Sequence, residues 1–168
     1  MTTILACGND PDIENELMQY FLKKPATIHH HKVFYSGNEE LSLCFLSTLP
    51  KEIYLKNSIL LFYSSFMCQK HTLNMQNSVV LSESSNKTAL HLLMESNVQV
   101  VTYGLQSTDS ITASSFGKER TLIALQREIL GLKGEKIDPY EFSIANEKLS
   151  KPTQLIVGAL EIFLQQIR

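Results

Sequence analysis

The sequence SVVLSESSNKTALHLLMESNVQVVTYG, residues 78–104, decides the fold of this chain. Its first apolar run, at residues 78–81, and its last, at residues 98–103, have the β-branched composition of short buried strands. The segment between them starts with the capping residues Ser84-Ser85-Asn86 and then repeats apolar residues at helical spacing: Ala89, Leu90, Leu93 and Met94. Strand, helix and strand in this order predict a crossover between two parallel strands, and therefore an α/β sheet.

The N-terminal residues repeat the pattern of strand, turn and helix. Residues 2–7 predict a buried strand, Gly8-Asn9 a turn, and Asp10-Pro11 the N-cap and first position of a helix that ends before Pro25. The apolar side of this helix is formed by Ile13, Leu17 and Phe21. Two more buried strands are expected, at residues 58–63 and at residues 27–34.

The predicted secondary structure changes after Gly104, from alternating strands and helices to consecutive strands. Residues 111–116, 122–130 and 136–144 read as an antiparallel meander, with a hairpin turn at residues 132–134. A closing helix is expected at residues 153–167, with Glu161, Gln165 and Gln166 toward solvent and an apolar side of Leu155, Ile156, Ala159, Ile162, Phe163 and Ile167. The whole chain, residues 1–168, is therefore expected to form one α/β domain. Its predicted architecture is a three-layer, Rossmann-like and mostly parallel sheet with a C-terminal antiparallel segment and a closing helix.

Composition sets limits on location and partners. The 168 residues are 43% hydrophobic and 19% charged, values typical of one globular domain. Fifteen Lys and Arg residues against 17 Asp and Glu residues give a net charge of -2, without the basic excess that nucleic-acid binding requires. The longest apolar run, residues 59–63, is far shorter than the ~20 residues that span a bilayer. With no basic and apolar leader at the N-terminus, these features predict a cytoplasmic protein that binds neither membrane nor nucleic acid.

Cysteines and histidines give no convincing reactive or metal site. Cys7, Cys44 and Cys68 are widely spaced and are expected to be reduced and mostly buried. Cys7 precedes a helix N-terminus, where a thiolate nucleophile is one alternative, but neighbouring carboxylates disfavour the thiolate. Two residues of His29-His30-His31 could share a metal ion with His71 or His91, yet adjacent residues on a strand cannot all converge. Neither a metal, a catalytic residue nor a cofactor is predicted.

The serine-rich turn at residues 82–87 is the better candidate for a binding site. Its hydroxyls, backbone N–H groups and Lys87 near a helix start suit an anion, although Ser84 or Ser85 acting only as the N-cap is the favoured alternative. Ligands of open α/β sheets bind beyond the carboxyl ends of the strands. The predicted ligand-binding residues along this edge are Gly8, Asn9, Ser82, Ser84, Ser85, Lys87 and Tyr103. The polar loop at residues 106–110 is interpreted as an ordinary turn.

Residues 78–85, the helix after them and the strand ending in Tyr103-Gly104 resemble the second half of the ATP-binding central domain of the Mur ligases. In that family one strand ends in an Asn-x-Asp-Asp type turn and the next in Tyr-Gly. An antiparallel segment then leads to an alanine-rich helix with an asparagine that contacts adenine. Residues 111–144 fit that segment and residues 154–159 fit that helix. The chain is also similar to short bacterial proteins of this type, and the resemblance holds only in outline before Ser78.

The departures from the family concern its ATP chemistry. Mur ligases hold ATP with a Gly-Lys-Thr or Gly-Lys-Ser loop, which is absent from this sequence. The corresponding strand-turn-helix segment, residues 7–12, presents Asp10, Asp12 and Glu14 around the helix N-terminus. Pro11 lacks the N–H that a phosphate cradle would use. A polyanion there would meet a repulsion of several kcal/mol at close range. Residues 82–85 replace the acidic turn of the family, and Gln154 stands at its adenine-contacting asparagine.

These observations predict a non-catalytic accessory or regulatory protein with a degenerate nucleotide-binding fold. The resemblance implies a link to cell-wall precursor metabolism. The alternative is a small-molecule or nucleotide-binding enzyme with a new site at the carboxyl edge of the sheet. A third interpretation is a protomer whose missing parts come from another chain, so the expected partner is a protein or a second copy.

Overall fold

The structure is a computed structural model, and it describes residues 2–22, 26–29, 32–36, 40–67, 72–96, 98–146 and 148–165. Three helices lie in this part of the chain: α1 (Pro11–Leu22), α2 (Lys87–Met94) and α3 (Lys151–Gln165). The strands of the first half are β1 (Thr2–Cys7), β2 (Ala26–His29), β3 (Lys32–Ser36), β4 (Glu40–Leu46), β5 (Glu52–Lys56), β6 (Ser58–Phe62), β7 (Thr72–Gln76) and β8 (Val79–Glu83). Those of the second half are β9 (Val100–Tyr103), β10 (Ile111–Phe116), β11 (Arg120–Leu125), β12 (Ile129–Leu130), β13 (Lys136–Ile137) and β14 (Tyr140–Ala145).

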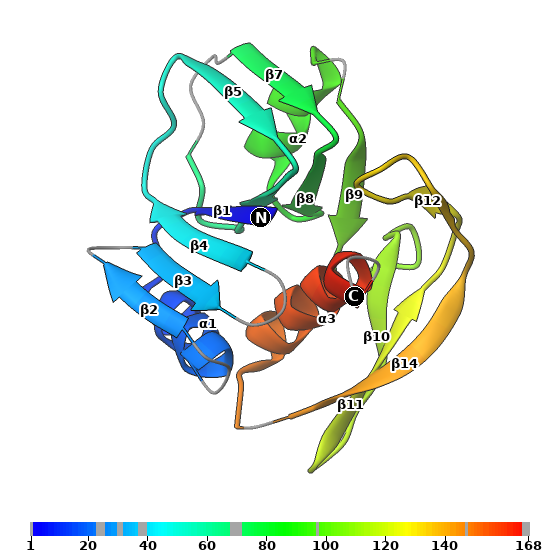
Figure 1. Ribbon diagram of the computed structural model, residues 1–168. Coiled ribbons are helices and arrows are strands. Elements are labelled where there is room, and N and C mark those ends of the chain that lie inside the picture. The colour runs from blue at the N-terminus through cyan, green and yellow to red at the C-terminus, as the bar shows by residue number, and fades with distance from the viewer. Residues whose placement is uncertain are drawn as a thin grey trace.

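The main sheet is mixed and mostly parallel, with ten strands in the order β14-β11-β10-β9-β8-β6-β1-β4-β3-β2. Its centre, from β4 to β9, is parallel throughout, whereas β11, β14, β2 and β3 pair in the antiparallel sense. The predicted crossover β8-α2-β9 is confirmed, as are the antiparallel C-terminal segment and the closing helix. Figure 1 shows β10, β11 and β14 curving around one side of α3.

The first helix begins and ends where the sequence predicts. The backbone N–H of Ile13 donates to Asp10 Oδ1 over 3.2 Å, so Asp10 caps the helix and Pro11 occupies its first turn. Ile13, Leu17 and Phe21 are all buried. The periodicity of the sequence therefore identified the buried side of α1 correctly.

Both faces of the parallel strands are covered. One face places Ile4 of β1 and Ile59 of β6 in a core with α1 and α3. The opposite face places Leu60 and Val80 in a second core with α2 and with a small parallel sheet formed by β5 and β7. Because both faces are buried, β6 is buried along its whole length, and its residues 59–62 are all apolar instead of alternating.

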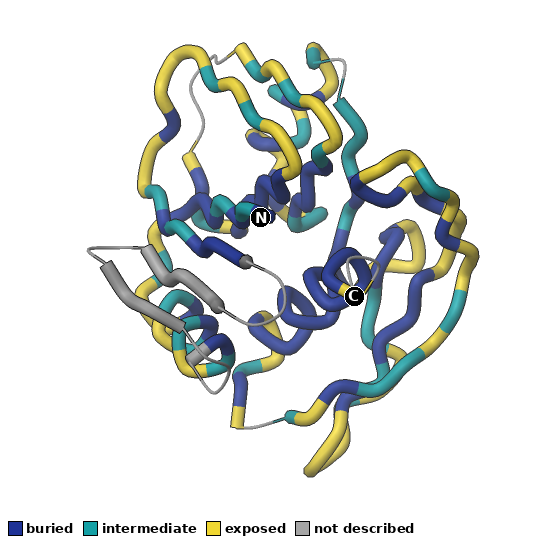
Figure 2. Tube along the Cα trace, in the orientation of Figure 1, coloured by how far each residue is buried: buried dark blue, intermediate teal, exposed yellow. Residues whose placement is uncertain are grey.

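The closing helix is buried on all sides, which corrects part of the sequence prediction. Every residue from Thr153 to Leu164 is buried, as the unbroken dark stretch in Figure 2 shows. Glu161, expected toward solvent, is only 5% exposed, and its Oε1 accepts a hydrogen bond of 2.6 Å from Tyr20 Oη. Gly158 lies so close to β11 that an added Cβ would be 2.6 Å from Ile123 Cγ1. The curved sheet thus wraps α3, and helical periodicity alone could not reveal this.

Three other predictions of local structure were wrong in detail. Residues 27–34 are not one strand, because β2 and β3 form an antiparallel pair with residues 30–31 outside the described part. The long extended segments after Leu122 are divided among β11, β12, β13 and β14. Met94, assigned to the buried side of α2, is 84% exposed because it is the last residue of that helix. The small sheet of β5 and β7 was not predicted at all.

Candidate functional site

The structure brings the predicted ligand-binding residues to one edge of the sheet. Cys7 pairs with Phe62, Phe62 with Ser82, and Glu83 with Tyr103 in successive parallel strands. Gly8 and Ser84 directly follow β1 and β8, and Tyr103 ends β9. The carboxyl ends of parallel strands meet at one edge, so these residues form a row, as predicted.

The strand order reverses between β1 and β6, because β4 follows β1 on one side and β6 lies on the other. A ligand of an open α/β sheet would bind beyond this point. Here the ring of Tyr63, the residue after β6, lies directly against Gly8: an added Cβ at Gly8 would be 2.4 Å from Tyr63 Cδ2. Tyr63 is completely buried. A protein side chain therefore fills the place where a ligand is expected.

The hydroxyl of Tyr63 is unusual among the described side chains. It is buried, and no described residue accepts or donates a hydrogen bond to it. Burial raises its pKa far above the ordinary tyrosine value, and the nearby Glu14, Cys7 and Asp10 raise it further. The group is thus a neutral donor in an acidic neighbourhood at the N-terminus of α1.

Tyr103, the second aromatic residue of the edge, is fixed by a hydrogen bond. Its hydroxyl donates to the carbonyl oxygen of Phe62 over 2.9 Å, and the side chain is only 2% exposed. Burial raises the pKa of Tyr103 well above its usual range, and Glu83 and Tyr63 add to the effect. As a buried neutral group that is already bonded to the backbone, Tyr103 serves packing between β6 and β9.

Two carboxylates occupy the donors that an anion would use. Glu83 accepts from the Ser64 N–H over 3.0 Å and from the Ser85 hydroxyl over 2.8 Å. Asp109 accepts from the Ser84 hydroxyl over 3.2 Å and from the Gln106 N–H over 2.8 Å. Since each carboxylate takes one hydroxyl and one backbone N–H, the protein supplies its own anions to this edge.

The other predicted residues are also engaged within the chain. The Asn9 N–H donates to Ser65 Oγ over 3.1 Å, and Lys87 Nζ donates to the Ser84 carbonyl over 3.2 Å. Ser82 is fully buried, and its hydroxyl points back to the Glu83 carbonyl over 3.5 Å. The edge therefore brings the predicted ligand-binding residues together, but their polar groups form hydrogen bonds within the protein.

The N-cap of α2 is Asn86, not Ser84 or Ser85. Its Oδ1 accepts from the Ala89 N–H over 2.9 Å. Its Nδ2 donates to the carbonyl oxygens of Tyr63 over 2.7 Å and Phe66 over 3.0 Å. Asn86 can fill this position because its amide group has an acceptor for the helix and two donors for the loop after β6, whereas a serine hydroxyl has one donor.

Sequence reasoning missed Tyr63, Glu83 and Asp109 as the residues that determine the edge. Glu83 lies inside the serine-rich turn that was predicted to bind an anion, and its own negative charge was the signal that it could take the anion's place. Asp109 was assigned to an ordinary turn, although it is 1% exposed and lies 2.5 Å from a Cβ added at Gly104. No sequence pattern pointed to Tyr63, because its contact with Gly8 depends on the strand register.

Gln154, which the resemblance places at the adenine-contacting asparagine of the Mur ligases, is buried and bonded within the protein. Its side chain bonds with Thr121 Oγ1, and its Nε2 donates to Asn146 Oδ1 over 2.8 Å and to the Leu149 carbonyl over 2.6 Å. Gln154 is 3% exposed. Its amide holds α3 to β11 and to the chain before the helix, which leaves no group for a base.

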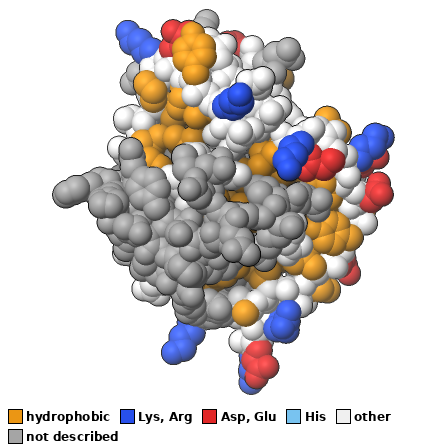
Figure 3. All heavy atoms as spheres, viewed as in Figure 1, with side chains coloured by type: hydrophobic (Ala, Val, Ile, Leu, Met, Phe, Trp, Pro, Cys, Tyr) orange, Lys and Arg blue, Asp and Glu red, His pale blue; other side chains and the backbone are white. Residues whose placement is uncertain are grey.

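The described residues hold no group of three or more His, Cys, Asp and Glu side chains arranged for a metal ion. Cys7 is buried and Cys44 is half-buried, both as thiols; Cys68, like His30, His31 and His71, lies outside the described residues. His91 is exposed on α2. On the face shown in Figure 3, the described cationic and acidic side chains are scattered rather than gathered.

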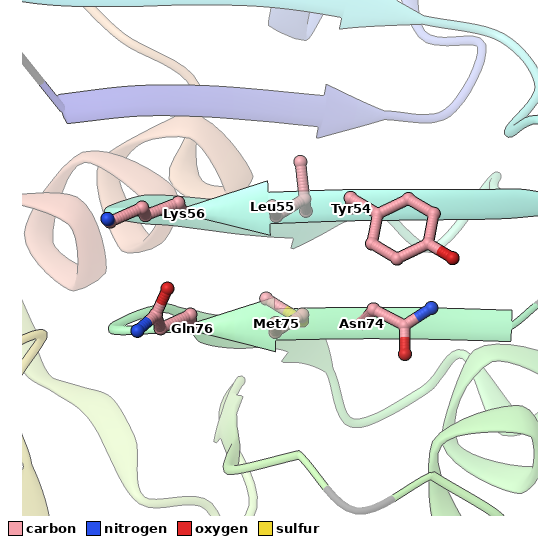
Figure 4. Close-up of a pocket in the computed structure, with 6 residues that line it drawn as sticks. All are labelled: Tyr54, Leu55, Lys56, Asn74, Met75 and Gln76. Atoms are coloured by element: carbon pink, nitrogen blue, oxygen red, sulfur yellow. The ribbon is translucent and has the colours of Figure 1, made fainter.

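Two grooves lie elsewhere on the described surface. One, of about 360 Å³, crosses the small sheet and is lined by Tyr54, Leu55, Lys56, Asn74, Met75 and Gln76. Figure 4 shows these residues in two facing rows, three from β5 and three from β7. The other, of about 340 Å³, lies between β9 and the chain around β12. Neither groove includes a residue predicted for ligand binding.

No protein-family model matches the chain, and a search of curated proteins finds no match either. Among the described residues, no helix is long and apolar enough to span a membrane.

Proposed function

We propose that this chain is a non-catalytic accessory or regulatory protein that acts by binding a partner. The single observation that carries the proposal is the Tyr63 ring against Gly8 at the reversal of strand order. In nucleotide-binding α/β proteins this place is kept clear for the ligand. Here a nucleotide could enter only if a fully buried aromatic side chain moved out.

The electrostatics of the edge support the same proposal. A phosphate bound there would have to displace Glu83 or Asp109 from their N–H and hydroxyl donors. It would also meet Asp10, whose Oδ1 already accepts from the N–H at the start of α1. Close carboxylates oppose a polyanion, so both the donors and the charge disfavour ATP.

The proposal includes a degenerate form of the Mur ligase central domain. Helices α1 and α3 on one face and α2 with the small sheet on the other support a three-layer, Rossmann-like arrangement. A link to bacterial cell-wall precursor metabolism, and a cytoplasmic location, rest on the resemblance and on the sequence alone. The partner is a protein or a second copy of the chain.

The test is ATP binding by the full chain. With millimolar ATP and magnesium, and separately with a uridine nucleotide, the melting temperature should rise by less than about 1 °C, since a ligand stabilises only the state that it binds. Equilibrium dialysis with labelled ATP should retain none on the protein. A rise of several degrees, or retained ATP, would overturn the proposal and support the alternative of an enzyme with a new site at this edge.

A further inference from the structure

The edge of β9 that faces away from β8 has no described strand paired with it beside Val100, at the start of the strand. β9 pairs with β8 from Val100 to Tyr103, but with β10 only where Tyr103 meets Ile111. Within the described chain, no strand pairs with this second edge between Val100 and Thr102. A gap therefore interrupts the main sheet beside these residues.

Backbone hydrogen bonds show which main-chain groups of β9 face the gap. Gln99 and Tyr103 accept through their carbonyl oxygens from Val80 and Ser84, over 3.0 and 3.1 Å, so these residues point toward β8. In a parallel ladder the direction alternates along the strand, which turns the N–H and C=O groups of Val100 and Thr102 outward. The bond of 3.1 Å from the Ser110 N–H to the Thr102 carbonyl agrees with this direction.

A second strand edge faces the gap from the other side. Gly131 donates to the Glu135 carbonyl over 2.7 Å, so in the antiparallel pair of β12 and β13 the groups of Leu130 point away from β13. Gln99 Nε2 donates to the Leu130 carbonyl over 2.7 Å, and Figure 1 shows β12 beside β9. The Gln99 side chain thus bridges the two edges next to Val100, and a segment that enters the gap would replace it at the Leu130 carbonyl.

The groove between these two edges, of about 340 Å³, is closed at one end, where one arginine lies. Its lining includes Val100, Ile129 and Leu130, and the loop at Ser110 closes it by bonding to Thr102. Arg127 lies at this closed end, with Nη2 donating to the Thr108 carbonyl over 2.9 Å. Glu128, also in the lining, forms an ion pair of 3.0 Å with Lys136. Among the described residues, Arg127 has no carboxylate partner.

We propose that this groove binds the C-terminal end of a partner protein as a short extended segment. Its main chain would pair with Val100 on one side and Leu130 on the other, as in strand addition. Its terminal carboxylate would bind the guanidinium of Arg127. A terminus fits better than an internal segment because the Ser110 loop blocks a strand from continuing past Thr102. The inference goes beyond the proposed function, since its site is separate from the carboxyl edge and its test does not involve ATP.

Amide exchange tests the geometry without any ligand. The N–H groups of Val100 and Thr102 should exchange about a hundredfold faster than that of Val101, which points to β8 in the centre of the sheet. Equal protection of all three would show that the groove is closed, and would overturn the proposal.

Peptide titration tests the binding. The probe is acetyl-Thr-Val-Thr-Val with a free C-terminus, compared with the same peptide as its C-terminal amide and with one N-methylated at alternate residues. The free acid should shift the amide resonances of Val100, Thr102 and Leu130, and leave Tyr54 in the other groove unchanged. Both altered peptides should bind about tenfold more weakly, because each loses a charge-assisted or main-chain hydrogen bond.

A pair of variants separates the carboxylate contact from general charge. Arg127→Ala should weaken the free acid about tenfold and leave the amide unaffected, whereas Lys133→Ala, an exposed cation of the same hairpin outside the groove, should change neither. No resonance shift in the groove, or equal binding of acid and amide by the native protein, would overturn the proposal.

Discussion

At the scale of single residues, the contact between Gly8 and Tyr63 has the clearest consequence. An added Cβ at Gly8 would lie 2.4 Å from Tyr63 Cδ2, a distance that real contacts do not reach. The ring is fully buried in the core and cannot move aside without disturbing its neighbours. Glycine is therefore required at this turn by close approach.

We expect Gly8→Ala to lower the free energy of unfolding by about 1–3 kcal/mol, because the new methyl group overpacks the space beside Tyr63. Urea denaturation measures the loss. In a Tyr63→Ala background the same substitution should cost clearly less, since the clash partner has gone. An equal cost in both backgrounds would contradict this explanation.

The two buried tyrosines of the edge offer a matched comparison. Tyr63→Phe removes a hydroxyl without a described partner and should leave stability unchanged or raise it by up to about 1 kcal/mol. Tyr103→Phe removes the donor to the Phe62 carbonyl and should lower stability by about 1 kcal/mol. Thermal unfolding of both variants checks the difference. A larger loss for Tyr63→Phe would mean that its hydroxyl has a partner, such as an ordered water.

At the scale of elements, α2 depends on one residue that also anchors a loop. Asn86 caps the helix through Oδ1 and holds the Tyr63 and Phe66 carbonyls through Nδ2. The sequence correctly placed the N-cap of α2 among Ser84, Ser85 and Asn86. The structure shows that the cap is Asn86, the candidate whose side chain also has two donors. Local capping rules rank Ser and Asn about equally, so only the tertiary contact separates them.

Asn86→Ala should therefore lower the free energy of unfolding by about 2 kcal/mol or more, because the helix loses its N-cap and the Tyr63 and Phe66 carbonyls each lose a donor. Ser85→Ala is the control, because Ser85 is exposed and its hydroxyl bonds only to Glu83, so the loss of stability should stay within about 0.5 kcal/mol. Chemical denaturation of the pair tests the assignment, and similar losses would refute it.

At the scale of the whole molecule, Glu16 joins the first helix to the last. It accepts from the Ser150 N–H over 2.9 Å and from the Ser150 hydroxyl over 2.7 Å. Burial acts to raise the pKa of Glu16, but hydrogen bonds from Thr153 and Ser150 outweigh it and hold the pKa below the usual 4.5. The ionised carboxylate therefore helps to dock α1 beside the start of α3.

Because the pKa of Glu16 is lowered in the folded state, its carboxylate stabilises the fold fully above about pH 4.5. This stabilisation is lost as the pH falls through the folded pKa. The difference in unfolding free energy between native protein and Glu16→Gln should thus be largest near neutral pH and shrink in acid. The difference in unfolding free energy between native protein and Ser150→Ala should also shrink in acid, because this variant lacks the hydroxyl that donates to Glu16. A difference that stays constant from about pH 7 to pH 3 would contradict the assignment.

Local patterns in the sequence determined the crossover of residues 78–103, the start and end of α1, the antiparallel C-terminal segment and the set of residues at the carboxyl edge. They are recoverable because apolar spacing and capping act within a few residues. Only the tertiary structure decided that Tyr63 fills that edge, that Glu83 and Asp109 occupy its donors, that Glu161 is buried, and that β9 and β12 leave a groove. Those outcomes depend on strand register and on close approach between distant residues, such as Ser84 and Asp109, 25 positions apart.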